Sequence, residues 1–284
     1  MYLWRNDNES RQKKRSRGQH RACMGHPRPC MPAPPLSFAF GLLMRGAKKM
    51  LANNASQYFG KDLEAMSFAK NYHKWILAEF SPYLGSSVAE VGAGMGGFST
   101  LLLETDIRSL VAFEPSQNMY PLLQEALSKD TRARTVNDFF GRTTTGEHFD
   151  SIVYVNVLEH IEDDASELSN ARDSLNPQGH LLIFVPALPW LYSEIDRQVG
   201  HYRRYVKKDL VELTQQSGFF VVDARYFDIA GILPWYINFV LLKNPFSTGS
   251  VSLYDRIVVP VMRLMEGLVP LPVGKNVLLV ARKA

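Results

Sequence analysis

The chain has 284 residues, 46% of them hydrophobic, which is enough for one large domain with a substantial core. Its net charge of +4 is unevenly distributed: residues 1–50 hold eleven Lys and Arg but only two acids, so residues 51–284 are net acidic, at −5. The basic side chains therefore form a tail and not a face of the folded body, which argues against a nucleic-acid partner. No apolar run reaches the roughly 20 residues of a membrane span.

Residues 1–50 are rich in Arg, Lys and Pro and lack apolar periodicity, so we expect a disordered basic tail. It is either a targeting segment, an arm for an anionic surface, or an extension ahead of a later start at Met44 or Met50. Both cysteines, Cys23 and Cys30, lie in it. The body from residue 51 on therefore has no thiol chemistry, which suits a reducing, cytoplasmic compartment, and we expect no metal site in the tail.

Apolar residues at helical spacing predict a helix over residues 62–80, and short apolar runs alternate with helical patterns from there on. The predicted strands are 87–91, 110–114, 132–136, 149–156, 180–186, 219–227 and 276–283; the predicted helices start near Phe98 or span 115–128, 163–175 and 206–218. This alternation predicts an α/β fold, with a Rossmann-like, doubly wound, seven-stranded and mostly parallel sheet, helices on both faces and helical insertions toward the C-terminus.

The stretch VAEVGAGMGGFST, residues 88–100, follows the first predicted strand and has two possible uses. Gly92, Gly94 and Gly97 have the G-x-G-x-x-G spacing of a dinucleotide turn, and Glu114 lies at the distance expected for a ribose contact. Glu90 opposes that interpretation, because a buried carboxylate is costly unless it is paired, and a phosphate-binding turn does not favour a second anion. A ligand that carries an ammonium group accounts for Glu90 better.

Further polar residues follow the other predicted strands. Glu114 ends VAFEPS, Asp138 lies in NDFF after the third strand, and Asn156 opens NVLEHIED after the fourth. Because parallel strands end at the same edge of the sheet, we expect these side chains to gather beside the glycine turn.

These stretches together resemble a known family. VAEVGAGMGGFS resembles the first motif of class I S-adenosylmethionine-dependent methyltransferases, E/D-x-G-x-G-x-G. VAFEPS resembles their second motif, NDFF their adenine loop, NVLEHIED their turn after the fourth strand, and LNPQGHLLI their lead-in to the fifth. The resemblance covers residues 60–284 and implies the class I methyltransferase fold with S-adenosyl-L-methionine as cofactor, and it predicts that residues 51–284 form the methyltransferase domain.

The resemblance also implies roles for individual residues. Glu114 would accept from the ribose hydroxyls, and Asp138 from the adenine amino group. Tyr72, on the helix before the first strand, would hold the methionine carboxylate or serve only in packing. The full set of implied cofactor residues is Tyr72, Glu90, Gly92, Ala93, Gly94, Gly96, Glu114, Pro115, Asn137, Asp138, Phe139, Asn156 and Val157.

Residues 187–210 follow the fifth strand, and with the chain up to residue 275 they are the expected lid and acceptor region. Titratable and aromatic side chains are dense here and suit an anionic or polyhydroxylated acceptor, or else an internal ion pair between Asp196 and an arginine that pins the lid. The predicted acceptor residues are Asp196, Tyr202, Arg203, Arg204 and Tyr205. The pattern D-x-x-x-G-H-Y-R-R-Y resembles a methyltransferase type 11/12-like subgroup associated with polysaccharide and secondary-metabolite genes.

An oxygen or nitrogen acceptor must lose a proton, and histidine titrates near neutral pH. His160, in the turn after the fourth strand, is the first candidate base, and His201 is the second. Ubiquinone-type O-methyltransferases have a similar Glu-His turn that joins a metal site, but Asn156 replaces one of their carboxylates here, so we expect no metal.

The segment 225–245 is strongly apolar and contains Pro234. We expect a helix buried against the sheet; the alternatives are a cap on an apolar acceptor pocket, a dimer face, or a peripheral membrane contact.

The sequence therefore predicts transfer of a methyl group to an O or N atom of a small-molecule, sugar or lipid-linked acceptor, in a cytoplasmic monomer or homodimer. The alternatives are an NAD(P)-dependent oxidoreductase that uses the same turn, and a catalytically silent methyltransferase-fold binding subunit.

Overall fold

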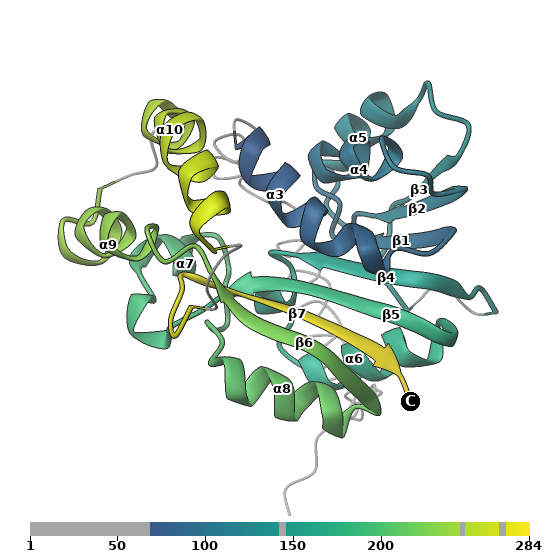
Figure 1. Ribbon diagram of the computed structural model, residues 1–284. Coiled ribbons are helices and arrows are strands. Elements are labelled where there is room, and N and C mark those ends of the chain that lie inside the picture. The colour runs from purple at the N-terminus through teal and green to yellow at the C-terminus, as the bar shows by residue number, and fades with distance from the viewer. Residues whose placement is uncertain (1–68, 142–145, 245–247, 267–270) are drawn as a thin grey trace, which may run out of the picture. The chain divides into compact units, whose positions relative to one another are not determined.

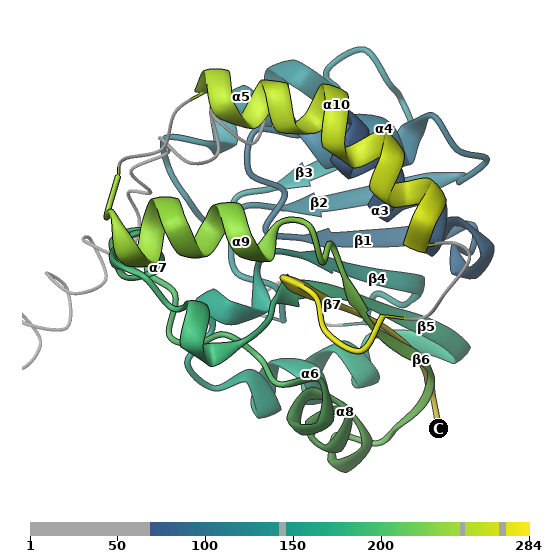
Figure 2. The same ribbon diagram turned by 60° about the vertical axis from the view of Figure 1, so that its left-hand side comes forward.

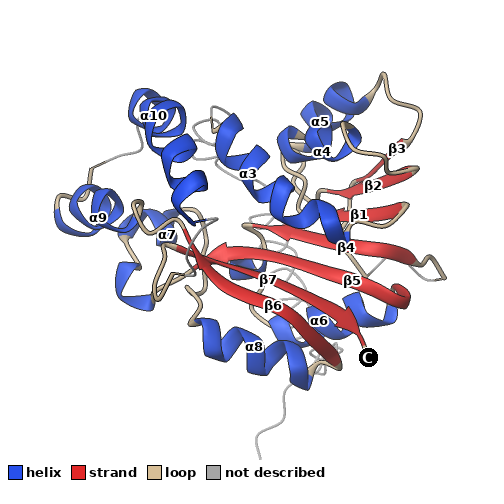
Figure 3. Cartoon of the chain, viewed as in Figure 1, coloured by secondary structure: helices blue, strands red, loops and turns tan. Residues whose placement is uncertain are grey.

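The computed structural model describes residues 69–141, 146–244, 248–266 and 271–284. The predicted tail and the first part of the helix predicted over 62–80 lie outside the described residues. Within them, seven strands form one sheet in the order β3-β2-β1-β4-β5-β7-β6 (Figure 1, Figure 3). The order reverses between β1 and β4, and an open α/β sheet binds its ligand at such a point.

The first half of the sheet matches the predicted apolar runs closely. Its strands, all parallel, are β1 (Ser87–Val91), β2 (Ser109–Phe113), β3 (Ala133–Val136) and β4 (Phe149–Val155). The helices here are α3 (Lys70–Phe80), the short η1 (Ser81–Tyr83), α4 (Gly97–Leu103) and α5 (Tyr120–Leu127). The helix predicted from Pro115 starts only at Tyr120, because residues 117–119 form a turn and Pro121 occupies the first helical turn instead.

The second half ends on a strand that reverses direction. Its elements are η2 (Leu158–His160), α6 (Asp164–Asp173), β5 (Leu175–Pro186), η3 (Pro189–Leu191), α7 (Glu194–Gln198), α8 (Lys207–Gln216), β6 (Phe219–Phe227), α9 (Ile232–Trp235), the π-helical η4 (Tyr236–Leu241), α10 (Thr248–Glu266) and β7 (Asn276–Lys283). β7 is antiparallel to both β5 and β6. β5 begins earlier than predicted, because a bulge in its register with β4 takes up the Pro-x-Gly turn.

Both faces of the sheet are covered, as the apolar runs predict for a parallel sheet. Alternate residues of β5 point to opposite faces: Leu182 and Phe184 pack with α3, α4, α5 and α10, whereas Leu181 and Ile183 pack with α6 and α8. Figure 1 shows these two helix layers on either side of the sheet. The core therefore has two layers, and the carboxyl ends of the strands remain available for a site.

The segment 225–245 does not form the predicted buried helix. Its first residues complete β6, and α9 and η4 then contain no buried residue. Both faces of the sheet are already occupied there, since α10 packs on α3 and α8 packs on β6 and β7. Of the helices in the described residues, none is long and apolar enough to cross a bilayer.

Candidate active site

The glycine turn between β1 and α4 has a backbone that most residues cannot adopt. Gly92, Gly94 and Gly96 have φ values of +70°, +57° and +84°, in the left-handed region that glycine tolerates. A Cβ atom on Gly92 would lie 2.5 Å from Cγ2 of Val157. The amides of Gly92 and Ala93 both donate to the carbonyl of Phe113, at 2.9 Å. The glycines therefore let the turn approach the ends of β2 and β4 closely.

Glu90 is buried in β1, directly before this turn. The hydroxyl of Ser99, on α4, donates to its carboxylate. Burial raises the pKa of Glu90 to about 8, and the Ser99 hydrogen bond offsets only part of that shift. A bound cation would favour the ionised carboxylate, so the local chemistry fits the ammonium group of an amino-acid ligand.

Glu114, at the end of β2, ties the glycine turn to the next loop. Its carboxylate accepts from the amides of Gly94 and Ser116, both at 2.8 Å. Burial raises its pKa, and the two backbone hydrogen bonds oppose that shift. Each carboxylate oxygen has a second lone pair, so Glu114 can still accept from ligand hydroxyls. Pro115 lies between Glu114 and Ser116 in the sequence and joins these two residues.

The loop after β3 is held against Glu114. The side-chain amide of Asn137 donates to the carbonyl of Glu114 at 2.8 Å, and Gln117 donates to the Asn137 side chain at 2.9 Å. The Asp138 carboxylate accepts from the amide of Phe139 at 2.8 Å, and the Phe139 ring is exposed. This places the predicted ribose and adenine residues next to each other.

Tyr72 takes part in a network that the sequence did not predict. Its hydroxyl lies within hydrogen-bond distance of Asp228 (3.1 Å) and Asn276 (3.0 Å), and its ring packs against Phe184. Asp228 also forms an ion pair with Lys275 at 3.0 Å. These contacts favour the packing role for Tyr72, and its contact with a methionine carboxylate stays a prediction. Asp228, the residue directly after β6, was the one signal in the sequence for this network.

The turn after β4 lies against the glycine turn through Val157. Asn156 has a φ of +55°, and its amide donates to the carbonyl of Phe184 at 2.8 Å. This conformation starts the tight turn that carries Val157 over Gly92 and leads into η2.

Glu159, His160 and His201 form a cluster that the fold assembles from two segments. The two imidazole rings have centroids 4.5 Å apart, and Nε2 of His201 lies 3.9 Å from a carboxylate oxygen of Glu159. Burial raises the pKa of Glu159 to about 7 and lowers that of His160 to about 3. Both Glu159 oxygens are buried, and neither has a hydrogen-bond partner among the residues that the structure describes. Among the described residues, these three side chains could together hold a metal ion; the expected absence of a metal stays a prediction.

Asp196, on α7, orients His201 and neutralises Arg204. One oxygen of Asp196 lies 2.9 Å from Nδ1 of His201 and 2.8 Å from the Arg204 guanidinium, and the other accepts from Ser193. The Arg204 guanidinium lies 4.5 Å from the ring centroid of Trp235. Asp196 and Arg204 are both buried, so the internal ion pair, one of the two alternatives from the sequence, is present.

Of the remaining predicted acceptor residues, Arg203 and Tyr205 make structural contacts, whereas the Tyr202 side chain is exposed. Arg203 forms an ion pair with Asp164 at 2.7 Å, and the hydroxyl of Tyr205 donates to the same carboxylate at 2.9 Å. Both contacts hold the loop to the start of α6. The Tyr202 ring is exposed, and its amide donates to the carbonyl of Glu159. Of these residues, Tyr202 has the side chain most accessible to an acceptor.

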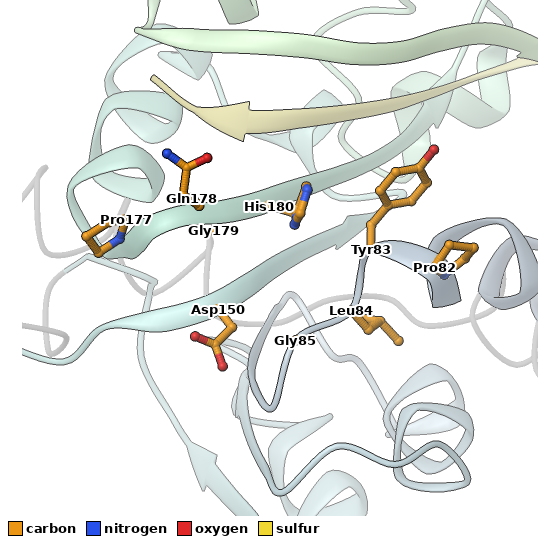
Figure 4. Close-up of a pocket in the computed structure, with 9 residues that line it drawn as sticks. All are labelled: Pro82, Tyr83, Leu84, Gly85, Asp150, Pro177, Gln178, Gly179 and His180. Atoms are coloured by element: carbon orange, nitrogen blue, oxygen red, sulfur yellow. The ribbon is translucent and has the colours of Figure 1, made fainter.

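A pocket at the opposite edge of the sheet is separate from this site. Figure 4 shows it between the start of β4 and the bulge of β5. Asp150 lines it and accepts from the amides of Ser86 and Ser87 and from the side chain of Asn176. These hydrogen bonds join loops at the amino ends of the strands, so Asp150 has a structural role in this pocket.

Comparison with known proteins agrees with this geometry. Residues 56–224, more than half of the chain, match the model of a family described as a methyltransferase domain. A tRNA U34 carboxymethyltransferase of Campylobacter concisus is 30% identical over 125 residues, 43% of this chain and 42% of that protein. The chain thus matches less than half the length of this curated relative.

Solved structures share the fold at low identity. A methyltransferase of Bacillus halodurans has a TM-score of 0.52 and 20% identity, over 73% of this chain and 98% of that one. A complex of the Haloferax volcanii Trm112 methyltransferase activator with a methyltransferase gives 0.55 and 14%, over 79% and 94%. The N-methyltransferase NodS of Bradyrhizobium japonicum, in complex with S-adenosyl-L-homocysteine, gives 0.50 and 15%, over 76% and 87%. With the motif-bearing turns assembled at one edge of this sheet, the chain belongs to the methyltransferase domain family and is an S-adenosylmethionine-dependent methyltransferase of class I fold.

Proposed function

We propose that this methyltransferase acts on an oxygen or nitrogen atom of a small-molecule, sugar or lipid-linked acceptor, with a histidine as base. The observation that carries the proposal is the cluster of Glu159, His160 and His201, which begins two residues after the Val157 that covers Gly92. When bound, S-adenosyl-L-methionine supplies an electrophilic methyl group, and an O–H or N–H acceptor must lose its proton as it reacts.

The residues around the glycine turn would hold the cofactor. Glu90 would pair with its ammonium group, which compensates the burial of that carboxylate. Glu114 would accept from the ribose hydroxyls through the lone pairs that its two backbone contacts leave free. Asp138, with Asn137 and Phe139, would face the adenine.

His201 is the better candidate base of the two histidines. Burial lowers the pKa of His160 to about 3, so its imidazole is neutral but gains little free energy by taking a proton. The Nδ1 atom of His201 faces Asp196, an arrangement that fixes the ring and leaves Nε2 to accept a proton. Glu159 lies 3.9 Å from that Nε2 and, with a pKa raised to about 7 by burial, could take the proton on.

A tRNA acceptor is the second candidate, because the curated relative from Campylobacter concisus carries that name. The net acidic charge of residues 51–284 disfavours it, since RNA binding draws largely on cationic side chains.

The test follows radioactive methyl from labelled S-adenosyl-L-methionine into cell extracts separated into lipid, small-molecule and RNA fractions. We expect label in the lipid or small-molecule fraction. The His201→Ala variant should transfer methyl groups more slowly by a factor of about 10² or more, and calorimetry should show an unchanged cofactor affinity in that variant. The Glu114→Ala variant should weaken cofactor binding instead.

Each other outcome contradicts a specific part of the proposal. Label that is sensitive to ribonuclease would favour the tRNA candidate. If His160→Ala loses methyl transfer while His201→Ala retains it, the base is His160 and not His201. A calorimetric response to NADH but none to S-adenosyl-L-methionine would favour the NAD(P)-dependent oxidoreductase. Cofactor binding without methyl transfer to any fraction would favour a catalytically silent binding subunit.

A further inference from the structure

The α9–α10 surface exposes an unusual amount of apolar side chain. Ten large apolar residues on α9, η4 and α10, and the residue after η4, are between 39% and 71% exposed: Leu233, Tyr236, Ile237, Leu241, Leu242, Leu253, Ile257, Val261, Leu264 and Met265. These are more than half of all large hydrophobic side chains that are exposed in the part of the chain that the structure describes. A folded chain rarely leaves such a concentration in water without a binding role.

The exposed residues of α10 lie on one face of the helix. Leu253, Ile257, Val261 and Leu264 follow each other at intervals of four, four and three residues, which stacks them along one side. The opposite side of α10 contributes Val259 and Met262 to the core. The helix therefore has two apolar sides, one packed in the protein core and the other exposed to solvent.

The charged side chains that this surface exposes are cationic. In the described residues of α9, η4, α10 and the chain after η4, Lys243, Arg256 and Arg263 are exposed. The acids point inward: Asp255 is buried and accepts from the amide of Tyr72, and Glu266 accepts from the amides that begin the α9 loop. Arg256 and Arg263 are seven residues apart, two helical turns, so they lie on the same flank of the apolar stripe.

We propose that the α9–α10 surface docks on an anionic phospholipid bilayer. Its apolar side chains would enter the boundary between headgroups and acyl chains, and its three cations would reach lipid phosphates. A second copy of the chain fits less well, because a two-fold contact uses the same face on both copies, and the described residues of this face expose cations but no acid to pair with them. None of the described helices could span a bilayer, so the contact is interfacial.

The position of the surface relates it to the active site. Figure 1 and Figure 2 show α9 beyond the ends of β4 and β5, on the side of the glycine turn, and α10 running back over α3. Docking would therefore bring the acceptor side of the sheet close to lipid. That a lipid-linked acceptor is thereby presented rests on the proposed function, whereas the docking itself does not.

The test is flotation of the full chain with vesicles of phosphatidylcholine alone or mixed in about equal parts with phosphatidylglycerol. We expect binding to the mixed vesicles and much weaker binding to the neutral ones. A Leu253→Gln/Ile257→Gln/Leu264→Gln variant should lose at least about tenfold in affinity, and an Arg256→Gln/Arg263→Gln variant about fivefold for each cation. All variants keep the basic residues of the first fifty positions, so any contribution from that segment is the same in each.

The matched control is Phe220→Gln/Val222→Gln, which removes two exposed apolar side chains from β6. It should float like the wild type. All the replaced residues are exposed, so the urea midpoints of the variants should match that of the wild type, which would exclude misfolding. Failure of the wild type to bind mixed vesicles, or equal losses in the apolar variant and the control, would overturn the proposal. A dimer in sedimentation that the apolar variant abolishes would assign this surface to a second copy instead. Because flotation needs no catalysis, its outcome is independent of whether the proposed acceptor chemistry is right.

Discussion

Replacing Gly92 by alanine should strongly destabilise the protein, for two separable reasons. At its φ of +70°, a residue with a Cβ atom costs roughly 1–2 kcal/mol more than glycine. The added Cβ would also lie 2.5 Å and 2.9 Å from the two methyl carbons of Val157, and overpacking of this kind costs about 1–3 kcal/mol. The sum is a loss of about 2–5 kcal/mol in the free energy of unfolding.

Gly146 provides a control that isolates the steric part. Its φ is +88°, and among the residues that the structure describes a Cβ atom there would meet no heavy atom within 4 Å. Gly146→Ala should therefore cost only the backbone strain, and the effect of the substitution on the unfolded chain is the same at both positions. The difference between the two variants, about 1–3 kcal/mol, measures the clash with Val157.

The measurement is urea unfolding followed by circular dichroism, with ΔG from the midpoint and slope. In a Val157→Ala background the two methyl contacts disappear and only the Cβ of residue 157, at 3.3 Å, remains close. Gly92→Ala should then cost little more than Gly146→Ala, with a coupling of about 1–3 kcal/mol in the double-mutant cycle. Equal costs for the two glycine variants, or strict additivity with Val157→Ala, would refute the idea that close approach to β4 is what requires glycine at position 92.

Three further predictions concern buried charge. Burial holds the pKa of Glu90 at about 8 in the free protein, and an ammonium group pairs only with the ionised carboxylate. The dissociation constant for S-adenosyl-L-methionine should therefore rise by up to about tenfold per pH unit below 8. Calorimetry on the Glu90→Gln variant should show no such pH dependence. Asp196→Asn should cost about 3–5 kcal/mol in urea unfolding because it leaves Arg204 buried without a counter-charge, and Asp196→Leu/Arg204→Met should recover most of that loss; equal stability of the single and double variants would argue against it. Glu114→Ala leaves the amide of Gly94 without its partner and should cost about 1–3 kcal/mol, besides weakening the cofactor; an unchanged melting temperature would mean that water replaces the carboxylate.

The sequence determined most of the strand positions and the edge of the sheet at which the predicted cofactor residues lie. β1, β6 and β7 have the predicted bounds, because a strand is a local run of apolar and β-branched residues that flanking residues terminate. The same holds for the glycine turn and for Glu114, which lie next to each other because parallel strands end at one edge. These features depend on residues close in sequence and on one rule of topology.

Only the tertiary structure decided which distant residues meet. His201 reaches His160 across forty residues because the loop after α7 folds back over the turn after β4. The partner of Asp196 among the neighbouring arginines, Arg204 and not Arg203, depends on that loop path as well. The apolar segment after β6 read as a buried helix, yet α3, α10 and α8 had already covered the sheet, so it remained exposed. Local hydrophobicity states how strongly a segment favours burial; whether a surface is left to bury it depends on every other element of the fold.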